Sequence, residues 1–137
     1  MKKWLIYDYV NEQGVNEIAA WARKYLQKKE RTKLNSKLNM IAENGPDLPG
    51  LLLKTEVEYI YKIKVQGNPK LRPMICHGPF KEIDDETGEE CETITLLVGA
   101  KEISWDFEPR GADIEAGIRR QIILRDRKRR VKHERIN

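Results

Sequence analysis

Hydrophobic and polar residues recur with two different periods in the first part of the chain, and the change of period separates a strand from helices. Residues 2–10 (KKWLIYDYV) are rich in aromatic and branched side chains and predict a strand. Apolar residues then recur at three- and four-residue intervals over 15–26 and again over 34–42. The pattern predicts two amphipathic helices with a break near 30–32. Asn-Gly-Pro at 44–46 predicts the end of the second helix, because glycine fits a left-handed cap and proline cannot continue a helix.

The second half of the chain returns to the period of strands. Residues 55–66 alternate strongly, and 71–77 follow after a Gly-Asn-Pro turn. Pro73 has no N–H, so we expect it at an edge, a bulge or a position outside the hydrogen-bonded ladder. Residues 93–100 (TITLLVGA) form the most hydrophobic run and predict a central strand. A short connection is expected over 105–109.

A final helix is predicted over about 112–130, within a basic helix or tail that covers about 112–137. Its apolar face is expected to contain four isoleucines, namely Ile114, Ile118, Ile122 and Ile123. The element order is therefore β-α-α-β-β-β-α. Consecutive strands on short turns predict an α+β domain with a small, mostly antiparallel sheet and helices packed on one face. The length of 137 residues fits one domain, 1–137.

Composition narrows the class of protein. No stretch approaches about 18 uninterrupted apolar residues, so we expect no membrane span, and the N-terminal apolar run is broken by Asp8 without a cleavage site after it. The two cysteines, Cys76 and Cys91, are too few for a disulfide framework or a four-cysteine zinc site. A reduced, cytoplasmic protein with no metal and no cofactor is the simplest interpretation.

The net charge of +4 conceals a strong segregation of charge. Residues 82–92 carry seven acids and no base, and we expect 81–92 to form an acidic loop or hairpin with Thr87-Gly88 at its tip. Residues 119–135 carry nine Lys or Arg and two acids. Such a basic tail favours an anionic partner, most simply nucleic acid, although a solvated amphipathic helix that binds nothing has the same pattern.

Cations also gather around the predicted sheet. Alternation in Tyr61-Lys62-Ile63-Lys64-Val65 sends Lys62 and Lys64 to one face, and the short turn to the next strand allows Arg72 to join them. Lys101 follows the central strand, with Trp105 and Phe107 shortly after it. A basic patch flanked by aromatic rings can bind phosphates and stack bases, as single-stranded RNA requires. The plainer alternative is a solvated outer face of the sheet.

These motifs resemble a known family. The order YKIKV, LRP, an apolar strand ending in Gly-x-Lys and a basic final helix resembles the RelE/HigB-type toxins of type II toxin–antitoxin systems. The segments KLNSKLNMIAENGPDLPGLLLK, LRPMICHGP and TLLVGAKEISWDFEP resemble the phage-derived branch of that superfamily. The resemblance covers nearly the whole chain in the right order, except for the acidic segment 81–92, and implies a RelE-like fold.

The resemblance implies roles for individual residues. Lys62 and Lys64 match strand lysines, one of which takes the proton from a ribose 2′-OH, and Arg72 matches an arginine that stabilises the scissile phosphate. Lys101 stands where RelE-like enzymes carry an arginine for phosphate contact or general acid catalysis. Phe107 falls near a tyrosine that stacks on the mRNA base. Lysine lacks the bidentate fork of arginine and phenylalanine lacks the hydroxyl, so these two positions depart from the family pattern.

The activity implied is that of a ribosome-dependent mRNA endoribonuclease, which inhibits translation through 2′-OH attack without a metal. We expect further RNA contacts from Trp105 and from the arginines of the tail, namely Arg119, Arg127, Arg129 and Arg130. Two alternatives stay open: a non-enzymatic toxin similar to ParE-like gyrase inhibitors, and a module that binds RNA or the ribosome without cleavage.

A toxin of this type implies specific partners. The resemblance implies mRNA and the ribosome as targets, and a small helix-turn-helix antitoxin with which the toxin forms a hetero-oligomer. An antitoxin would cover the basic face with acidic surface or displace the final helix. The acidic segment 82–92 raises the alternative that the chain shields its own basic face.

Overall fold

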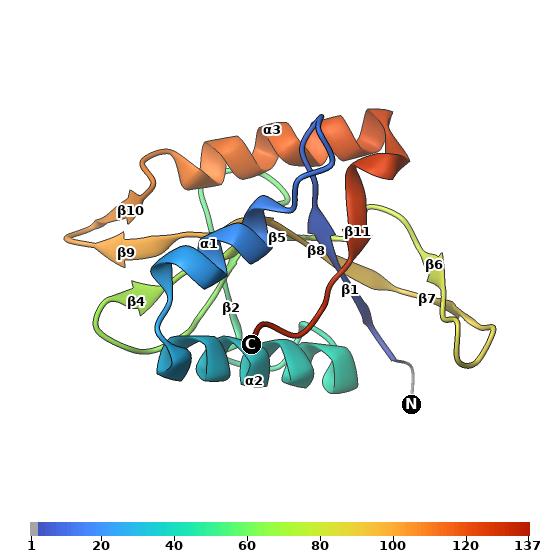
Figure 1. Ribbon diagram of the computed structural model, residues 1–137, viewed down its shortest axis with the longest axis horizontal. Coiled ribbons are helices and arrows are strands. Elements are labelled where there is room, and N and C mark those ends of the chain that lie inside the picture. Colours follow the sequence, from blue (N-terminus) through green and yellow to red (C-terminus); the bar gives the residue numbers. More distant parts are fainter. Residues whose placement is uncertain (1–2) are drawn as a thin grey trace.

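The computed structural model describes residues 3–137, so Lys2, the first residue of the predicted strand 2–10, lies outside the described residues. The main elements follow in the order β1 (Leu5–Tyr9), α1 (Glu17–Tyr25), α2 (Lys28–Asn44), β2 (Leu52–Lys54), β3 (Tyr61–Ile63), β4 (Lys70–Leu71), β5 (Met74–His77), β6 (Glu82–Ile83), β7 (Glu90–Cys91), β8 (Thr93–Val98), β9 (Lys101–Ile103), β10 (Asp106–Glu108), α3 (Ala112–Arg125), a 3₁₀ turn (Arg127–Arg129) and β11 (Arg130–Lys132). Figure 1 shows their arrangement.

Six strands form the main sheet in the order β11-β1-β8-β5-β3-β2. Only β1 and β8 pair in parallel, and the other neighbours are antiparallel. Strand β8 lies inside the sheet and every one of its residues is buried. The prediction of an α+β domain with a mostly antiparallel sheet and a central strand at 93–100 is therefore confirmed.

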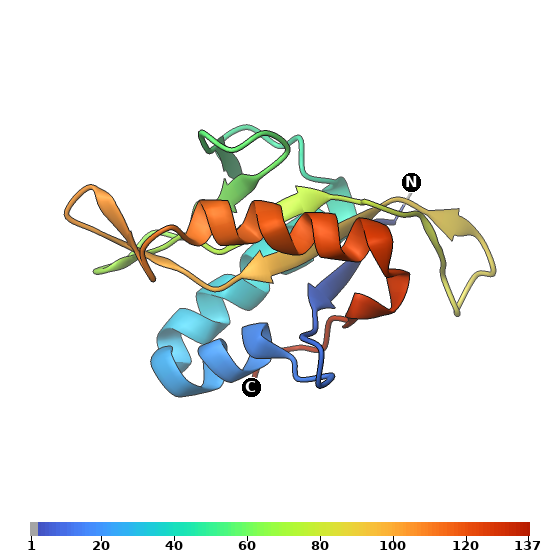
Figure 2. The same ribbon diagram turned by 90° about the horizontal axis from the view of Figure 1, so that it is seen from above.

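The helices cover both faces of the sheet, so the prediction of helices on one face is wrong. Alternation in β8 sends Ile94 and Leu96 to the face packed by α1 and α2, and Leu97 to the face packed by α3. In Figure 1, α3 runs along the top of the sheet and α2 along the bottom, and Figure 2 shows α3 crossing over the strands. Both faces of the inner strands are thereby removed from water, which explains their continuous apolar sequences.

Local capping decides where the first two helices begin and end. The Asn16 side chain accepts a hydrogen bond from Ala19 N at 3.0 Å and caps α1. The predicted break at 30–32 is wrong, because the Glu30 carboxylate accepts from Gln27 N at 2.9 Å and thereby caps the first turn of α2. The predicted stop is confirmed: Gly45 has a φ of 83° and its N–H donates to Ile41 O at 2.8 Å.

The predicted strand 55–66 is extended only over β3. Thr55 Oγ1 donates to Ile60 O at 2.8 Å and accepts from Val57 N at 3.1 Å, and Tyr59 has a φ of 70°. These contacts hold 55–60 in a tight loop. The segment therefore pairs with no strand in the part of the chain that the structure describes, although its sequence alternates.

The predicted strand 71–77 is divided between two sheets. Strand β4 ends at Leu71 and β5 begins at Met74, so Pro73 lies outside both ladders as expected. Strand β4 instead joins β9 and β10 in a three-stranded sheet that we call the arm. The segment 105–109, predicted as a connection, contains β10, because Ser104 and Trp105 both adopt positive φ and close a hairpin.

The chain after α3 also differs from the prediction. Helix α3 ends at Arg125, five residues before the expected end, where Asp126 Oδ1 accepts from Lys128 N at 3.1 Å. Strand β11 then pairs with β1 along the edge of the main sheet. Its continuation reaches α2, where the buried Asn35 amide donates to Ile136 O at 2.6 Å and accepts from Ile136 N at 3.1 Å.

Helix α3 buries a narrower face than the spacing of its isoleucines predicts. Ala112, Ala116 and Ile123 are buried, whereas Ile114 and Ile118 are 61% and 50% exposed. Small residues bring the helix close to β5 and β8, and the larger isoleucines of the first turns are left outside. The expectation that Ile114 and Ile118 belong to the core is therefore wrong.

Candidate functional site

Lys62 and Glu102 meet where the main sheet contacts the arm. Lys62 lies between Tyr61 and Ile63, which pack on the face covered by α1 and α2, so alternation directs it toward the face that carries α3. Its Nζ lies 3.4 Å from Glu102 Oε1 and 5.0 Å from the centre of the Phe107 ring. The lysine is therefore partly buried between a carboxylate and an aromatic ring.

Arg72 reaches the same carboxylate from the segment between β4 and β5. Its Nε lies 3.4 Å from Glu102 Oε2, and the residue is only 3% exposed. Its Nη1 donates to Leu71 O at 2.9 Å and to Val65 O at 3.2 Å. Glu102 thus stands between the ammonium of Lys62 and the guanidinium of Arg72, and we call these three residues the carboxylate cluster.

Glu102 did not emerge from the sequence because its strand was not predicted. The register of β9 places Glu102 opposite Lys70, and Lys101 opposite Leu71. Successive residues of a strand point to opposite faces, so Lys101 shares the face of the buried Leu71 and Glu102 shares the opposite face with Lys70. The signal in the sequence is the pair Lys101-Glu102 directly after the central strand.

The carboxylate cluster has the groups required for acid–base chemistry. A carboxylate is ionised at neutral pH and can therefore accept a proton, whereas a lysine with its ordinary pKa of about 10.4 is already protonated and cannot. An ammonium can donate a proton, and a guanidinium stabilises negative charge that develops on a phosphate. The cluster therefore combines a base, an acid and an electrostatic stabiliser without a metal.

Lys101 lies on the other side of the arm, so the four predicted catalytic cations do not converge. Its Nζ lies 3.2 Å from Tyr25 O, at the end of α1. Lys64 alternates with the buried Ile63 and Val65 and therefore shares the face of Lys62. Lys62 and Arg72 are brought together at Glu102, whereas the placement of Lys101 beside them is wrong.

The two aromatic residues of the arm have different surroundings. Phe107 packs partly into the core beside Lys62. Trp105 is fully exposed at the turn between β9 and β10. Both remain candidates for stacking on bases, but only Phe107 adjoins the carboxylate cluster.

Arg119 and Arg129 make contacts within the fold. Their guanidinium carbons lie 4.7 Å and 5.3 Å from the Tyr9 ring, one from α3 and one from the 3₁₀ turn. Arg119 also pairs with Glu17 at 2.8 Å, and Arg129 Nη2 donates to Tyr9 Oη at 2.7 Å. These arginines join α3 and the tail to α1 and β1. Their positive charges therefore have partners within the fold and need no RNA to explain them.

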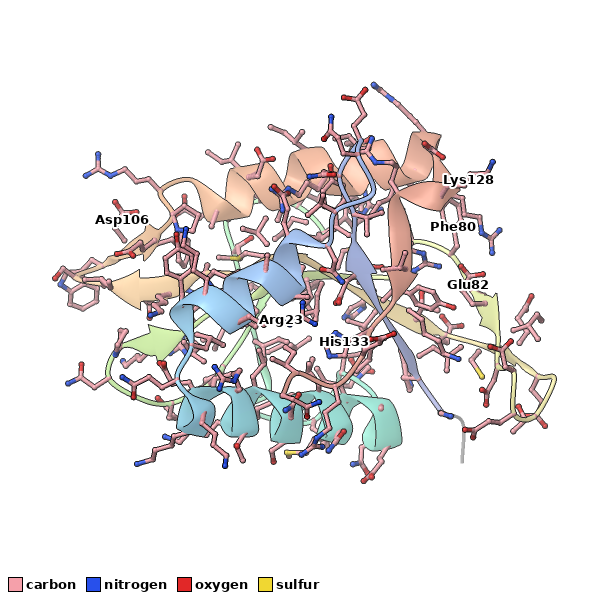
Figure 3. The ribbon with its side chains drawn as sticks, viewed as in Figure 1. Arg23, Phe80, Glu82, Asp106, Lys128 and His133 are labelled. Carbon is pink, nitrogen blue, oxygen red and sulfur yellow. The ribbon has the colours of Figure 1, made fainter. Side chains whose placement is uncertain are left out.

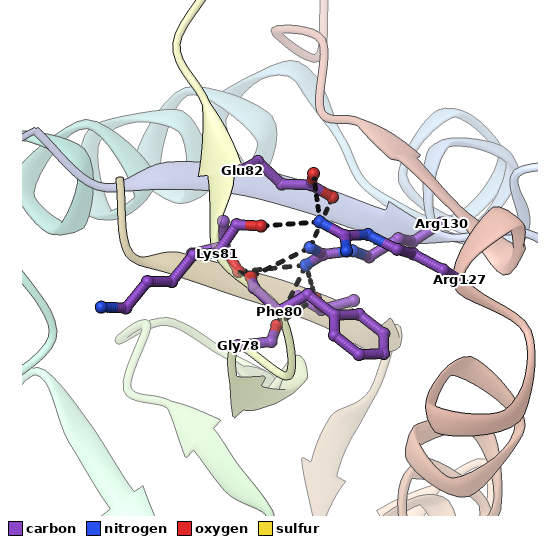
Figure 4. Close-up of polar contacts among 8 residues, drawn as sticks. Gly78, Phe80, Lys81, Glu82, Arg127 and Arg130 are labelled. Carbon is purple, nitrogen blue, oxygen red and sulfur yellow. Dashed lines mark hydrogen bonds and ion pairs between the residues drawn. The ribbon is translucent and has the colours of Figure 1, made fainter. Parts of the chain in front are cut away.

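Arg127 and Arg130 are held by the acidic hairpin of β6 and β7, as Figure 4 shows. Each donates to a Glu82 carboxylate oxygen at 2.8 Å. Arg130 is 5% exposed, so the expectation that it contacts RNA is wrong. The predicted hairpin at 81–92 is confirmed, with Thr87 and Gly88 in its turn.

The acidic hairpin and the arm lie at opposite ends of the molecule (Figure 1). Figure 3 shows Glu82 and Phe80 near Lys128 at one end, and Asp106 of the arm at the other. The hairpin therefore neutralises the tail, whereas Lys62 and Arg72 are paired by Glu102. Shielding of the strand cations by the segment 82–92 is inconsistent with this arrangement.

Comparisons of the chain with protein-family models, curated proteins and solved structures found no match. Within residues 3–137, no group of three or more His, Cys, Asp or Glu side chains is arranged to hold a metal ion. None of the helices in this part of the chain has the length and apolar character needed to cross a membrane.

Proposed function

We propose that the protein is a RelE/HigB-type toxin that cleaves mRNA on the ribosome through attack by the ribose 2′-OH. The observation that carries the proposal is the Glu102 carboxylate, 3.4 Å from both Lys62 Nζ and Arg72 Nε. Glu102 accepts the 2′-OH proton, and the 2′ oxygen attacks the adjacent phosphorus. Lys64 stabilises the phosphate charge, Lys62 protonates the departing 5′ oxygen, and the buried Arg72 holds the Glu102 carboxylate in position.

The proposal differs from the resemblance in the roles of individual residues. Glu102 replaces a lysine as the general base, because an ionised carboxylate needs no shift of its pKa to act at neutral pH. Phe107 supplies the ring beside the cluster on which a base stacks. Lys101 has no part in the chemistry, since its ammonium lies at the end of α1.

Partners follow from the proposed activity. A ribosome-dependent toxin acts in the cytoplasm on translated mRNA, and positioning by the ribosome supplies catalytic power that so small a cluster lacks. We further propose a helix-turn-helix antitoxin that forms a hetero-oligomer with this chain. Its acidic surface would compete with RNA for Lys62 and Lys64.

The test is in vitro translation of a reporter mRNA, with primer extension to map new 5′ ends. Glu102→Gln preserves the shape of the side chain, and we expect cleavage to fall about 10²–10⁴-fold. Glu12→Gln, at an exposed glutamate in the loop before α1, is the matched control and should cleave as the wild type does. Undiminished cleavage by folded Glu102→Gln would overturn the proposal.

A second candidate function is inhibition of translation by binding alone. The burial of Arg72, with Nη1 on two backbone carbonyls, favours it, because the guanidinium already has partners within the fold. In that case translation stops in the same assay while primer extension shows no new ends with the wild-type protein. The two candidates are thus separated by one experiment.

A further inference from the structure

Exposed cations without acidic partners gather where α1 meets α2. They belong to the last turn of α1 and the first turns of α2, and they are Arg23, Lys24, Lys28, Lys29 and Lys33. Among residues 3–137, none of them has a carboxylate oxygen within 4.0 Å. The one acid in this stretch, Glu30, is engaged in capping α2. This corner differs from the tail, whose arginines are held by the fold.

A hollow of about 400 Å³ lies between this corner and the loop 66–69. Three lysines line it, namely Lys29, Lys33 and Lys101, together with Tyr25 and Gln27. Lys33 Nζ lies 3.4 Å from Gln66 O, and Lys101 Nζ lies 3.2 Å from Tyr25 O. The ammonium groups therefore approach the hollow from α2 and from the arm.

A second hollow, of about 280 Å³, adjoins the first and shares Tyr25 and Lys101 with it. Trp21 lines it and lies against Gly99, where an added Cβ would be only 2.0 Å from the indole. Of its two acids, Glu17 is paired with Arg119 at 2.8 Å. The two hollows together form a cleft that is lined by both aromatic rings and lysines. We call it the α1–arm cleft.

We propose that the α1–arm cleft binds a segment of RNA with unpaired bases. This segment is distinct from the mRNA that is cleaved at the carboxylate cluster. Lys29, Lys33 and Lys101 contact backbone phosphates, and Tyr25 and Trp21 stack on bases, the combination typical of single-stranded nucleic-acid sites. Lys101 and Glu102 are successive residues of one strand and point to opposite faces, so the cleft and the carboxylate cluster cannot hold the same nucleotide. The choice of RNA as the polyanion rests on the proposed function.

The test measures binding of a fully 2′-O-methylated single-stranded oligonucleotide to the whole chain, by fluorescence anisotropy over a series of KCl concentrations. Such an oligonucleotide lacks the attacking hydroxyl, so binding is observed without cleavage. Lys29→Gln/Lys33→Gln should weaken binding at least about tenfold at low salt, and make the log–log salt dependence less steep by about 1.4, or about 0.7 for each lost contact. Tyr25→Leu should weaken binding without changing the salt dependence.

The control variant, Lys54→Gln/Lys128→Gln, removes the same charge from exposed lysines elsewhere and should bind with the wild-type salt dependence. Wild-type binding by Lys29→Gln/Lys33→Gln would overturn the proposal. So would competition by polyglutamate as effective as that by RNA, which would make the cleft a site for an acidic protein. Cleavage by Glu102→Gln is measured by primer extension and this site by anisotropy with Lys29→Gln/Lys33→Gln, so a failure of the proposed cleavage and a failure of this site give different results.

Discussion

The Arg130 guanidinium donates to the Glu82 carboxylate at 2.8 Å and thereby joins the basic tail to the acidic hairpin (Figure 4). The same guanidinium donates to Thr93 Oγ1 and Thr95 Oγ1, each at 3.0 Å. It also lies 4.4 Å from the centre of the Tyr7 ring. The two segments of opposite charge are therefore structural partners, and their segregation in the sequence reflects this pairing.

Arg130→Met should destabilise the fold by about 3–5 kcal/mol. The substitution leaves Glu82 and two threonine hydroxyls without their buried donor, and removing one member of a buried ion pair costs about this much. Urea unfolding followed by circular dichroism measures the effect. Lys128→Met, at an exposed position of the same turn, should change stability by less than about 0.5 kcal/mol. Equal stability of the two variants would contradict a structural role for Arg130.

Stability should fall at acid pH partly through Glu82. Burial raises the pKa of this carboxyl, but hydrogen bonds from Arg127 and Arg130 outweigh burial and hold the pKa below its ordinary value of 4.5. The contribution of a group with a lowered pKa is present above the ordinary value and is lost as the pH falls through the lowered one. Urea unfolding between neutral and strongly acid pH should therefore show a smaller loss below pH 4.5 for Glu82→Gln than for the wild type. Parallel curves would contradict this origin of the acid sensitivity.

Sequence patterns predicted the elements whose signal lies within one short stretch of the chain. The capped end of α2 at Gly45 and the buried strand β8 follow from short stretches of sequence. The end of α3 did not, because β11 gains its hydrogen bonds from β1, more than a hundred residues away in the chain. The helix was therefore predicted to continue to about residue 130, whereas it ends at Arg125 and Arg130–Lys132 form the edge strand β11.

The candidate site was predicted in part for a related reason. The predicted approach of Arg72 to Lys62 is confirmed, because both cations reach Glu102. The position of Lys101 depended on strand β9, which pairs with β4 in the arm rather than extending the main sheet. Without that pairing, nothing in the sequence separated Lys101 from the other cations or identified Glu102.

Arg72→Lys should lower the free energy of unfolding by about 2–3 kcal/mol. Lysine keeps the charge but lacks the Nη1 group that donates to both Leu71 O and Val65 O, and hydrogen bonds from charged donors are worth about 1.5–3 kcal/mol each. Urea unfolding measures the difference, with Lys70→Gln, at an exposed position of β4, as the control. If Arg72→Lys is as stable as the wild type, Arg72 does not hold this segment. Because Arg72 holds this segment, a loss of activity in Arg72→Ala would not separate catalysis from unfolding. Glu102→Gln does not have this disadvantage.

Gly99→Ala should destabilise the fold by about 1–3 kcal/mol, as overpacking of a filled site does. The added methyl would lie 2.0 Å from the Trp21 ring, so the indole or the backbone has to move. Thermal unfolding of the variant measures the cost. In a Trp21→Leu background the same glycine substitution should cost clearly less, because the ring that collides with the methyl is absent. An equal cost in both backgrounds would contradict the close approach of Trp21 to residue 99.

Cys76 should resist thiol reagents in the native protein. Burial raises the pKa of its thiol to about 12 despite the nearby charges of Arg120 and Arg130, so almost no thiolate exists at pH 8. The Cys91→Ser variant leaves Cys76 as the sole cysteine and allows its reaction with a disulfide reagent to be followed by absorbance. We expect negligible reaction under native conditions and rapid reaction after addition of urea. Because opening of the sheet is required first, the native rate should rise when Arg130→Met is added to this variant. Fast labelling of the native Cys91→Ser protein would mean that the α3 face of β5 is open to solvent.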